Sequence, residues 1–212
     1  MDEDLSDDPL EPGLPEWIEA AAEEARTVAL GMLREQGRGA VLVGVARVDA
    51  ALETLLKAAL EPPRSRETLF HPERPLGSFG AKVALAARLG LIDAAVEQSL
   101  HSLRRIRNAF AHSTTVVRLA DAPFRDQLEE SCRQARENPL WQPMQTTLDN
   151  HIATEGESSS QDDSGLQDYI LLITILVAFL ETAARLVAPI KPSVGLGFSG
   201  VKPVQIDADD HS

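Results

Sequence analysis

Apolar residues recur every three or four positions along most of this chain, and no stretch alternates as a half-buried strand does. Aromatic residues make up only 4% of the sequence, whereas alanine and leucine, which have high helix propensities, are abundant. Helices of this composition pack through aliphatic side chains. The sequence therefore predicts an all-α fold, a helical bundle of about five to six helices.

Capping residues, glycines and prolines set the ends of the expected helices. Ser78 and Asp93 are good N-cap residues, Gly90 is a C-terminal stop, and residues 113–119 are expected to be extended. The expected helical ranges are 15–37, about 40–60, 79–90, 94–112, 123–137 and about 166–187.

These helices are expected to form a single domain over residues 14–190. The acidic residues 1–13 are expected to be disordered, and residues 191–212 to form a flexible tail. An acidic, serine-rich stretch at about 150–165 is expected to be a flexible loop inside the domain.

Charge and cysteine content limit the function classes. The net charge of −13 repels nucleic acid at long range, so direct DNA binding is disfavoured. The single cysteine, Cys132, excludes an intrachain disulfide and is expected to be a small buried side chain. The acidic N-terminus is unlike a signal peptide, and the apolar run 169–180 is too short to span a bilayer. We therefore expect a cytoplasmic protein without a membrane segment.

The stretch 102–113 gathers basic and polar side chains within about three helical turns of this acidic chain. Its polar residues are Arg104, Arg105, Arg107, Asn108 and His112, and its expected buried stripe is Leu103, Ile106 and Phe110. At about 100° per residue, Arg107 and His112 lie about 140° apart on a continuous helix. They can converge on one ligand only if the helix ends near residue 111 or if a second copy of the chain contributes.

Two interpretations of this stretch stay open. In the first, an arginine binds a phosphate through parallel hydrogen bonds, and His112 takes a proton from a ribose 2′-hydroxyl, so that RNA is cleaved without a metal. In the second, His112 stabilises the C-terminal end of its helix, and the arginines pair with the many acidic side chains.

Ser78 and Glu53 are the remaining candidates for a ligand or partner surface. Ser78 either caps its helix or, with Lys82, holds an anion at the helix N-terminus. Glu53 pairs either with Lys57, four residues later, or with an arginine of 104–107, which would draw that arginine away from catalysis. The sequence has no Cys/His cluster, Gly-rich phosphate loop or Gly-x-Ser-x-Gly motif, so no metal or cofactor is expected.

Three segments together resemble the mannitol operon repressor family of helical bacterial proteins. They are residues 42–57, residues 75–92 with Leu-Gly-Ser-Phe and Leu-Gly-Leu-Ile, and residues 106–112 with Arg-Asn-Ala-Phe-Ala-His. The match covers about residues 25–137. The resemblance implies transcriptional regulation. Because no basic recognition helix is found, such regulation would act through a protein partner or a homodimer.

The spacing of Arg107 and His112, with Asn108 directly after the arginine, is also similar to the motif of the HEPN superfamily. Members are helical bundles, and many are ribonucleases that bring two motifs together across a dimer. This resemblance implies that Arg107 and His112 are the catalytic pair, that Asn108 supports them and that RNA is the ligand. We therefore expect a non-enzymatic regulatory protein, with a metal-independent ribonuclease as the alternative.

Overall fold

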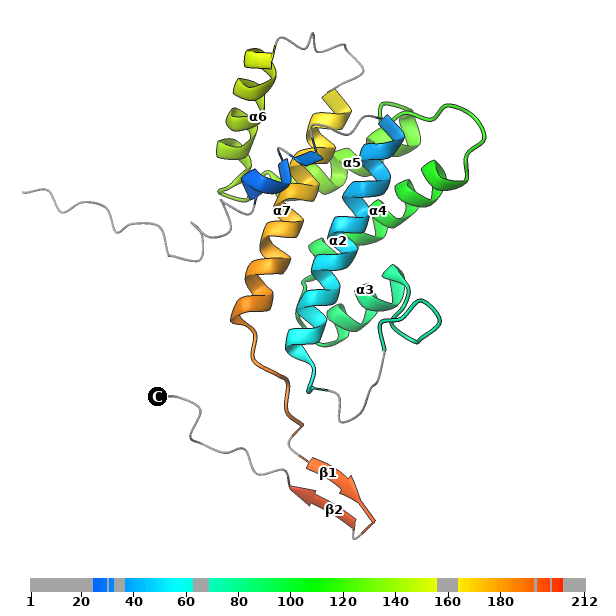
Figure 1. The fold of residues 1–212 in the computed structure, drawn as a ribbon, viewed down its shortest axis with the longest axis vertical. Coiled ribbons are helices and arrows are strands. Elements are labelled where there is room, and N and C mark those ends of the chain that lie inside the picture. Colours follow the sequence, from blue (N-terminus) through cyan, green and yellow to red (C-terminus); the bar gives the residue numbers. More distant parts are fainter. Residues whose placement is uncertain are drawn as a thin grey trace, which may run out of the picture.

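The computed structural model describes residues 25–29, 31–32, 37–62, 69–155, 164–192, 194–198 and 200–203. Within these residues, six helices have complete bounds, and residues 25–29 and 31–32 are helical as well. The helices are α2 (Gly37–Ala59), α3 (Phe79–Arg88), α4 (Ala94–His112), α5 (Ala122–Ala135), α6 (Trp141–Glu155) and α7 (Ser164–Leu186). The predicted all-α helical bundle is confirmed (Figure 1).

Helices α2 and α7, each of 23 residues, pack along each other at the centre of the bundle (Figure 1). Gly44 allows this close approach, because a β-carbon there would lie 2.6 Å from the hydroxyl oxygen of Tyr169. The same hydroxyl donates a hydrogen bond of 2.8 Å to the carbonyl oxygen of Val41. A buried phenol on α7 therefore fits over a glycine of α2, and a larger residue at position 44 would displace it.

By length and composition alone, helix α7 is long and apolar enough to cross a membrane over Gly165–Leu186. The apolar segment is therefore longer than the run 169–180 from which the sequence analysis excluded a membrane span. In the bundle, 67% of its apolar window is buried. It packs against α2, α5 and α6. Such a helix, apolar on nearly all sides and covered by other helices, is typical of the core of a helical protein.

The chain leaves the bundle just after α7. There the backbone N–H of Ile190 donates a hydrogen bond of 2.8 Å to the carbonyl oxygen of Ala59, the last residue of α2. The ends of the two central helices are thus joined by a backbone hydrogen bond.

Helix α6 was not expected from the sequence. Residues 150–155 are helical and α7 begins at Ser164, so the loop expected at about 150–165 is too wide, and its middle lies outside the described residues. Because α6 contains Pro143 and many polar residues, its sequence has only a weak helical pattern. The helix is held instead by packing, since Trp141 and Leu148 are buried in the core.

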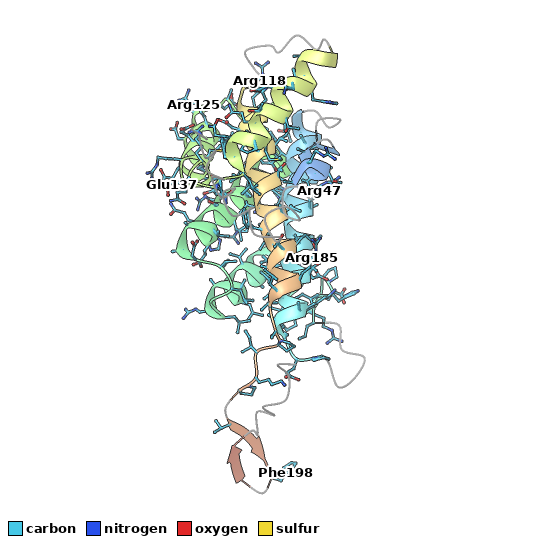
Figure 2. The ribbon with its side chains drawn as sticks, turned by 90° about the vertical axis from the view of Figure 1, so that its left-hand side faces the viewer. Arg47, Arg118, Arg125, Glu137, Arg185 and Phe198 are labelled. Atoms are coloured by element: carbon cyan, nitrogen blue, oxygen red, sulfur yellow. The ribbon has the colours of Figure 1, made fainter. Side chains whose placement is uncertain are left out.

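Part of the tail expected at 191–212 is a hairpin. Strands β1 (Val194–Gly197) and β2 (Gly200–Pro203) pair antiparallel, with Val194 opposite Pro203. The hairpin lies beyond the ends of α2 and α7, and the exposed Phe198 projects at its tip (Figures 1 and 2). Each strand has only four residues and contains glycine, which weakens a strand, so the sequence pattern is too short to predict them. Residues 1–13 and the end of the tail lie outside the described residues.

Candidate functional site on helix α4

Helix α4 presents the face that the sequence predicts. The stripe of Leu103, Ile106 and Phe110 is buried, and the Phe110 ring packs edge-on against the Phe124 ring at 5.4 Å between centroids. The helix begins at Asp93, whose Oδ1 accepts a hydrogen bond of 2.8 Å from the backbone N–H of Val96. With this stripe inward, the exposed side chains are Arg104, Arg105, Arg107, Asn108 and His112.

Three of these side chains, Arg104, Arg105 and Arg107, form what we call the arginine face. Arg105 donates hydrogen bonds to Gln127 and Ser102 at 3.4 and 3.0 Å, and Arg107 donates one of 3.2 Å to Asn108. Arg104 lies over Gly80 of α3, where a β-carbon would come within 2.8 Å of its Nη1. In the described part of the chain, no guanidinium of the arginine face forms an ion pair with a carboxylate.

On the neighbouring helix α5 and at its C-cap, by contrast, arginines are paired with carboxylates. There Arg133 lies 2.6 Å from Glu130, and Arg136 lies 2.6 Å from Glu129 and 3.2 Å from Asp168. Figure 2 shows charged side chains distributed over the outside of the bundle. The interpretation in which Arg104, Arg105 and Arg107 pair with acidic side chains is therefore not what the described part of the chain shows.

Glu53 contacts lysines, not an arginine. Its carboxylate lies 2.7 Å from Lys57 and 2.7 Å from Lys82, and Lys82 also lies 2.8 Å from Asp49. Burial alone would raise the pKa of Glu53, but hydrogen bonds from the two lysines outweigh it and lower that pKa. Burial likewise opposes the charge of Lys82, but its contacts with Asp49 and Glu53 raise its pKa above the ordinary value.

Ser78 serves as the N-cap of α3. Its Oγ accepts a hydrogen bond of 3.2 Å from the backbone N–H of Ala81. Lys82, the other residue considered for an anion site here, is only 4% exposed and is held by the two carboxylates of α2. Of the two roles considered for Ser78, the structure shows the cap.

The position at which α4 ends determines whether Arg107 and His112 can converge. The helix continues through His112, so the two side chains lie about 140° apart around its axis and do not converge within one chain. A cavity of about 520 Å³ lies beside this end of the helix, lined by Arg38, Phe110 and residues 114–119 among others. Neither Arg107 nor His112 lines it. This cavity therefore does not bring the two motif residues together.

Arg38 is a residue that sequence reasoning missed. It lies in the first turn of α2, and its guanidinium donates hydrogen bonds of 2.6 and 3.2 Å to the carbonyl oxygens of Ala111 and Ser113. These carbonyls at the end of α4 have no partner within the helix, so Arg38 satisfies them and fixes the end that carries His112. Arg38 is more than seventy positions from its partners. No local sequence pattern reveals such a contact.

Comparison with protein-family models, with curated proteins and with solved structures gives no match to this chain.

Among the described residues, Cys132 and the metal-ligating side chains do not indicate a further reactive site. Cys132 is buried as expected, its Sγ lies 3.7 Å from the carbonyl oxygen of Asp168, and burial strongly raises the pKa of the thiol. A thiol with a raised pKa stays protonated and is a poor nucleophile. Among the described residues, no three His, Cys, Asp or Glu side chains are grouped to hold a metal ion.

Proposed function

We propose that this chain is a non-enzymatic regulatory protein of the mannitol operon repressor type, and that it binds a protein partner through the arginine face of α4. The observation that carries the proposal is that Arg104, Arg105 and Arg107 are exposed and, among the described residues, have no carboxylate partner in a protein of net charge −13. Guanidinium groups on a helix that lack a carboxylate partner are suited to acidic side chains of another protein, because they can donate paired hydrogen bonds to carboxylates.

The packing of the three segments that resemble the repressor family supports the proposal. They lie on α2, on the turn and helix of α3, and at the end of α4, which pack against one another. Lys82 of α3 joins carboxylates of α2, and Gly80 of α3 makes room for Arg104 of α4. The segments that resemble the repressor family thus form the part of the bundle that supports the arginine face.

The proposal is for a binding surface and not a catalytic centre, because Arg107 and His112 do not converge within one chain. It includes a cytoplasmic location without membrane insertion, and regulation without direct contact to DNA, since the acidic net charge opposes it.

Photo-cross-linking in the native cells tests the proposal. A photo-reactive benzoylphenylalanine at Asn108 is expected to give a protease-sensitive adduct, and the same group at the exposed Glu129 of α5 serves as the control position. The double substitution Arg104→Glu and Arg107→Glu should remove the adduct, because charge reversal repels an acidic surface. The matched pair Arg125→Glu and Arg133→Glu on α5 should keep it.

Two results would contradict the proposal. The first is an Asn108 adduct no stronger than that at Glu129, and the second is an adduct degraded by ribonuclease and not by protease. The mass of a protein adduct distinguishes a second copy of this chain from a different partner.

A HEPN-type ribonuclease is the second candidate, favoured by the exposure of Arg107, Asn108 and His112 and by the hydrogen bond between the first two. In a dimer, His112 would take the proton of a ribose 2′-hydroxyl and Arg107 would stabilise the phosphorane. The products would be a 2′,3′-cyclic phosphate and a free 5′-hydroxyl.

Incubation of the purified protein with total RNA in EDTA tests the second candidate. It predicts cleavage that His112→Ala abolishes without changing the melting temperature, and that His101→Ala, on the same helix, leaves intact. Intact RNA with the wild-type protein, or cleavage that survives His112→Ala, excludes this candidate.

A further inference from the structure

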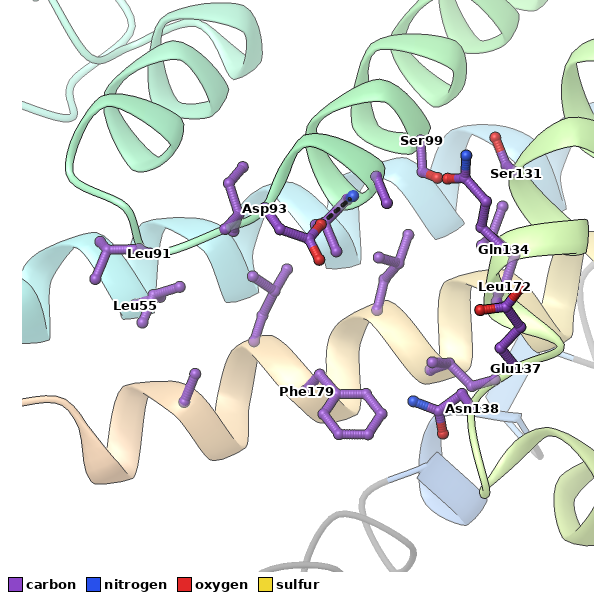
Figure 3. A pocket seen from close by; sticks show the side chains of 18 of the residues that line it. Leu55, Leu91, Asp93, Ser99, Ser131, Gln134, Glu137, Asn138, Leu172 and Phe179 are labelled. Carbon is purple, nitrogen blue, oxygen red and sulfur yellow. Dashed lines mark hydrogen bonds between the residues drawn. The ribbon is translucent and has the colours of Figure 1, made fainter.

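A cavity of about 570 Å³ opens between α4, α5 and α7, away from the residues of the arginine face (Figure 3). This volume is in the range of pockets that bind small organic molecules. The cavity is lined by residues of four helices and of the turns before α4 and after α5. It is therefore built by the core helices themselves and not by one surface loop.

One part of the cavity is apolar. Leu172, Leu176 and Phe179 of α7 form a wall, and Leu55 and Leu91 close the end away from α5 (Figure 3). Phe179 is partly buried and packs against the hydrophobic core. An apolar wall of this kind binds hydrocarbon groups through the area that they remove from water.

The other part offers hydrogen-bond acceptors. Glu137 and Gln134 lie at the α5 end (Figure 3), and Asn138 beside them already accepts a hydrogen bond of 2.9 Å from the backbone N–H of Leu140. Gln134 donates from Nε2 towards a carboxylate oxygen of Glu130 at 3.5 Å, which fixes its orientation because a carboxylate only accepts. The Oε1 of Gln134 is then buried without a donor. Such an acceptor costs stability unless a partner supplies a hydrogen.

The charges around the cavity have one sign. Asp93 and Glu137 are exposed carboxylates in its lining, and none of the lining residues that the structure describes is a lysine, arginine or histidine. One oxygen of Asp93 is used as the cap of α4, which leaves the other available. An anionic ligand would therefore meet repulsion, and a cation would meet attraction that the net charge of −13 reinforces.

We propose that this cavity binds an amphipathic amine, with its apolar body against α7 and its hydrogen-donating head at the Gln134 and Glu137 end. The proposal goes beyond the partner surface on α4, which uses different residues. An ammonium group has three donors and no acceptor, which matches a lining that has unsatisfied acceptors and carboxylates.

Binding of three matched probes to the purified full chain tests the proposal. By calorimetry, n-octylamine is expected to bind at least about tenfold more tightly than n-octanoate or 1-octanol, because only the amine pairs with the carboxylates and the amide. Shortening the amine to n-hexylamine should weaken binding about sixteenfold, since each buried methylene is worth about fourfold. Equal binding of octanoate, or no binding of octylamine at millimolar concentration, would overturn it.

Substitution of Gln134 separates the cavity from nonspecific binding. Gln134→Leu is expected to weaken octylamine about tenfold and to leave the melting temperature of the free protein unchanged or higher, because it removes a buried acceptor that has no partner. Gln127→Leu, on the same helix outside the cavity, should leave octylamine binding unchanged. If Gln134→Leu does not fold, Glu137→Gln, on the exposed rim, replaces it with the same expected direction. Wild-type affinity in the folded variant would contradict the proposal.

Discussion

Replacing Phe110 by alanine is expected to lower the free energy of unfolding by about 3–5 kcal/mol. The ring is 1% exposed, belongs to the buried stripe of α4 and packs edge-on against Phe124. Its removal leaves a cavity between α4 and α5 that rigid helices cannot fill. Denaturant unfolding followed by the helical circular dichroism signal measures the change.

Arg107→Ala is the matched control, since Arg107 lies three residues away on the same helix. It should change the free energy of unfolding by less than about 0.5 kcal/mol, because this side chain is exposed and its hydrogen-bond partner among the described residues is the adjacent Asn108. Within the segment 106–112, the two substitutions together distinguish Phe110, which stabilises the fold, from Arg107, which is available to a ligand. An equal loss from both would mean that Arg107 holds the fold, and the arginine face would lose its proposed role.

Lys82→Met is expected to lower the free energy of unfolding by about 3 kcal/mol. The lysine is 4% exposed and lies between Asp49 and Glu53, which are 32% and 25% exposed. Without the lysine, these two carboxylates of α2 repel each other beside an apolar side chain. Lys57→Met is the control, because Lys57 is 58% exposed and a surface pair contributes less than about 1 kcal/mol.

The pH dependence of the same variant tests the cause. The pKa of Glu53 is lower in the folded chain than its ordinary value of 4.5, so the stability that it contributes is present above pH 4.5 and is lost as the pH falls through the folded pKa. The pKa of Lys82 is raised, so its contribution is lost only as the pH rises above its ordinary value of 10.5. Lys82→Met should therefore lose less stability than the wild type on acidification below pH 4.5. An unchanged acid limb would show that Glu53 does not depend on Lys82.

The features that the sequence predicted are those encoded locally. The helical period and the caps at Ser78 and Asp93 placed α3 and α4, and the buried stripe through Phe110 identified which face of α4 points outward. Each of these depends on residues within one or two turns of one another. A single sequence carries that information directly.

The features that could not be predicted depend on tertiary neighbours. Arg38 finds its carbonyl partners at the end of α4 only after α2 and α4 have packed, and Lys82 is buried only because α3 places it against the carboxylates of α2. The same holds for α6, whose own sequence is a poor helix former and which relies on Trp141. The lack of carboxylate partners at the arginine face is likewise a property of the tertiary arrangement. The acidic composition of the chain alone would favour ion pairs there.

The backbone hydrogen bond from Ile190 to Ala59 determines where the cooperative unit of this protein ends. Because it ties the residues after α7 to the last turn of α2, the C-terminal ends of the two central helices cannot fray independently. In native-state hydrogen exchange, we therefore expect the amides at these two helix ends to be protected together. The β1–β2 hairpin begins beyond this bond, and we expect its strands to open in a separate local equilibrium that leaves the bundle folded.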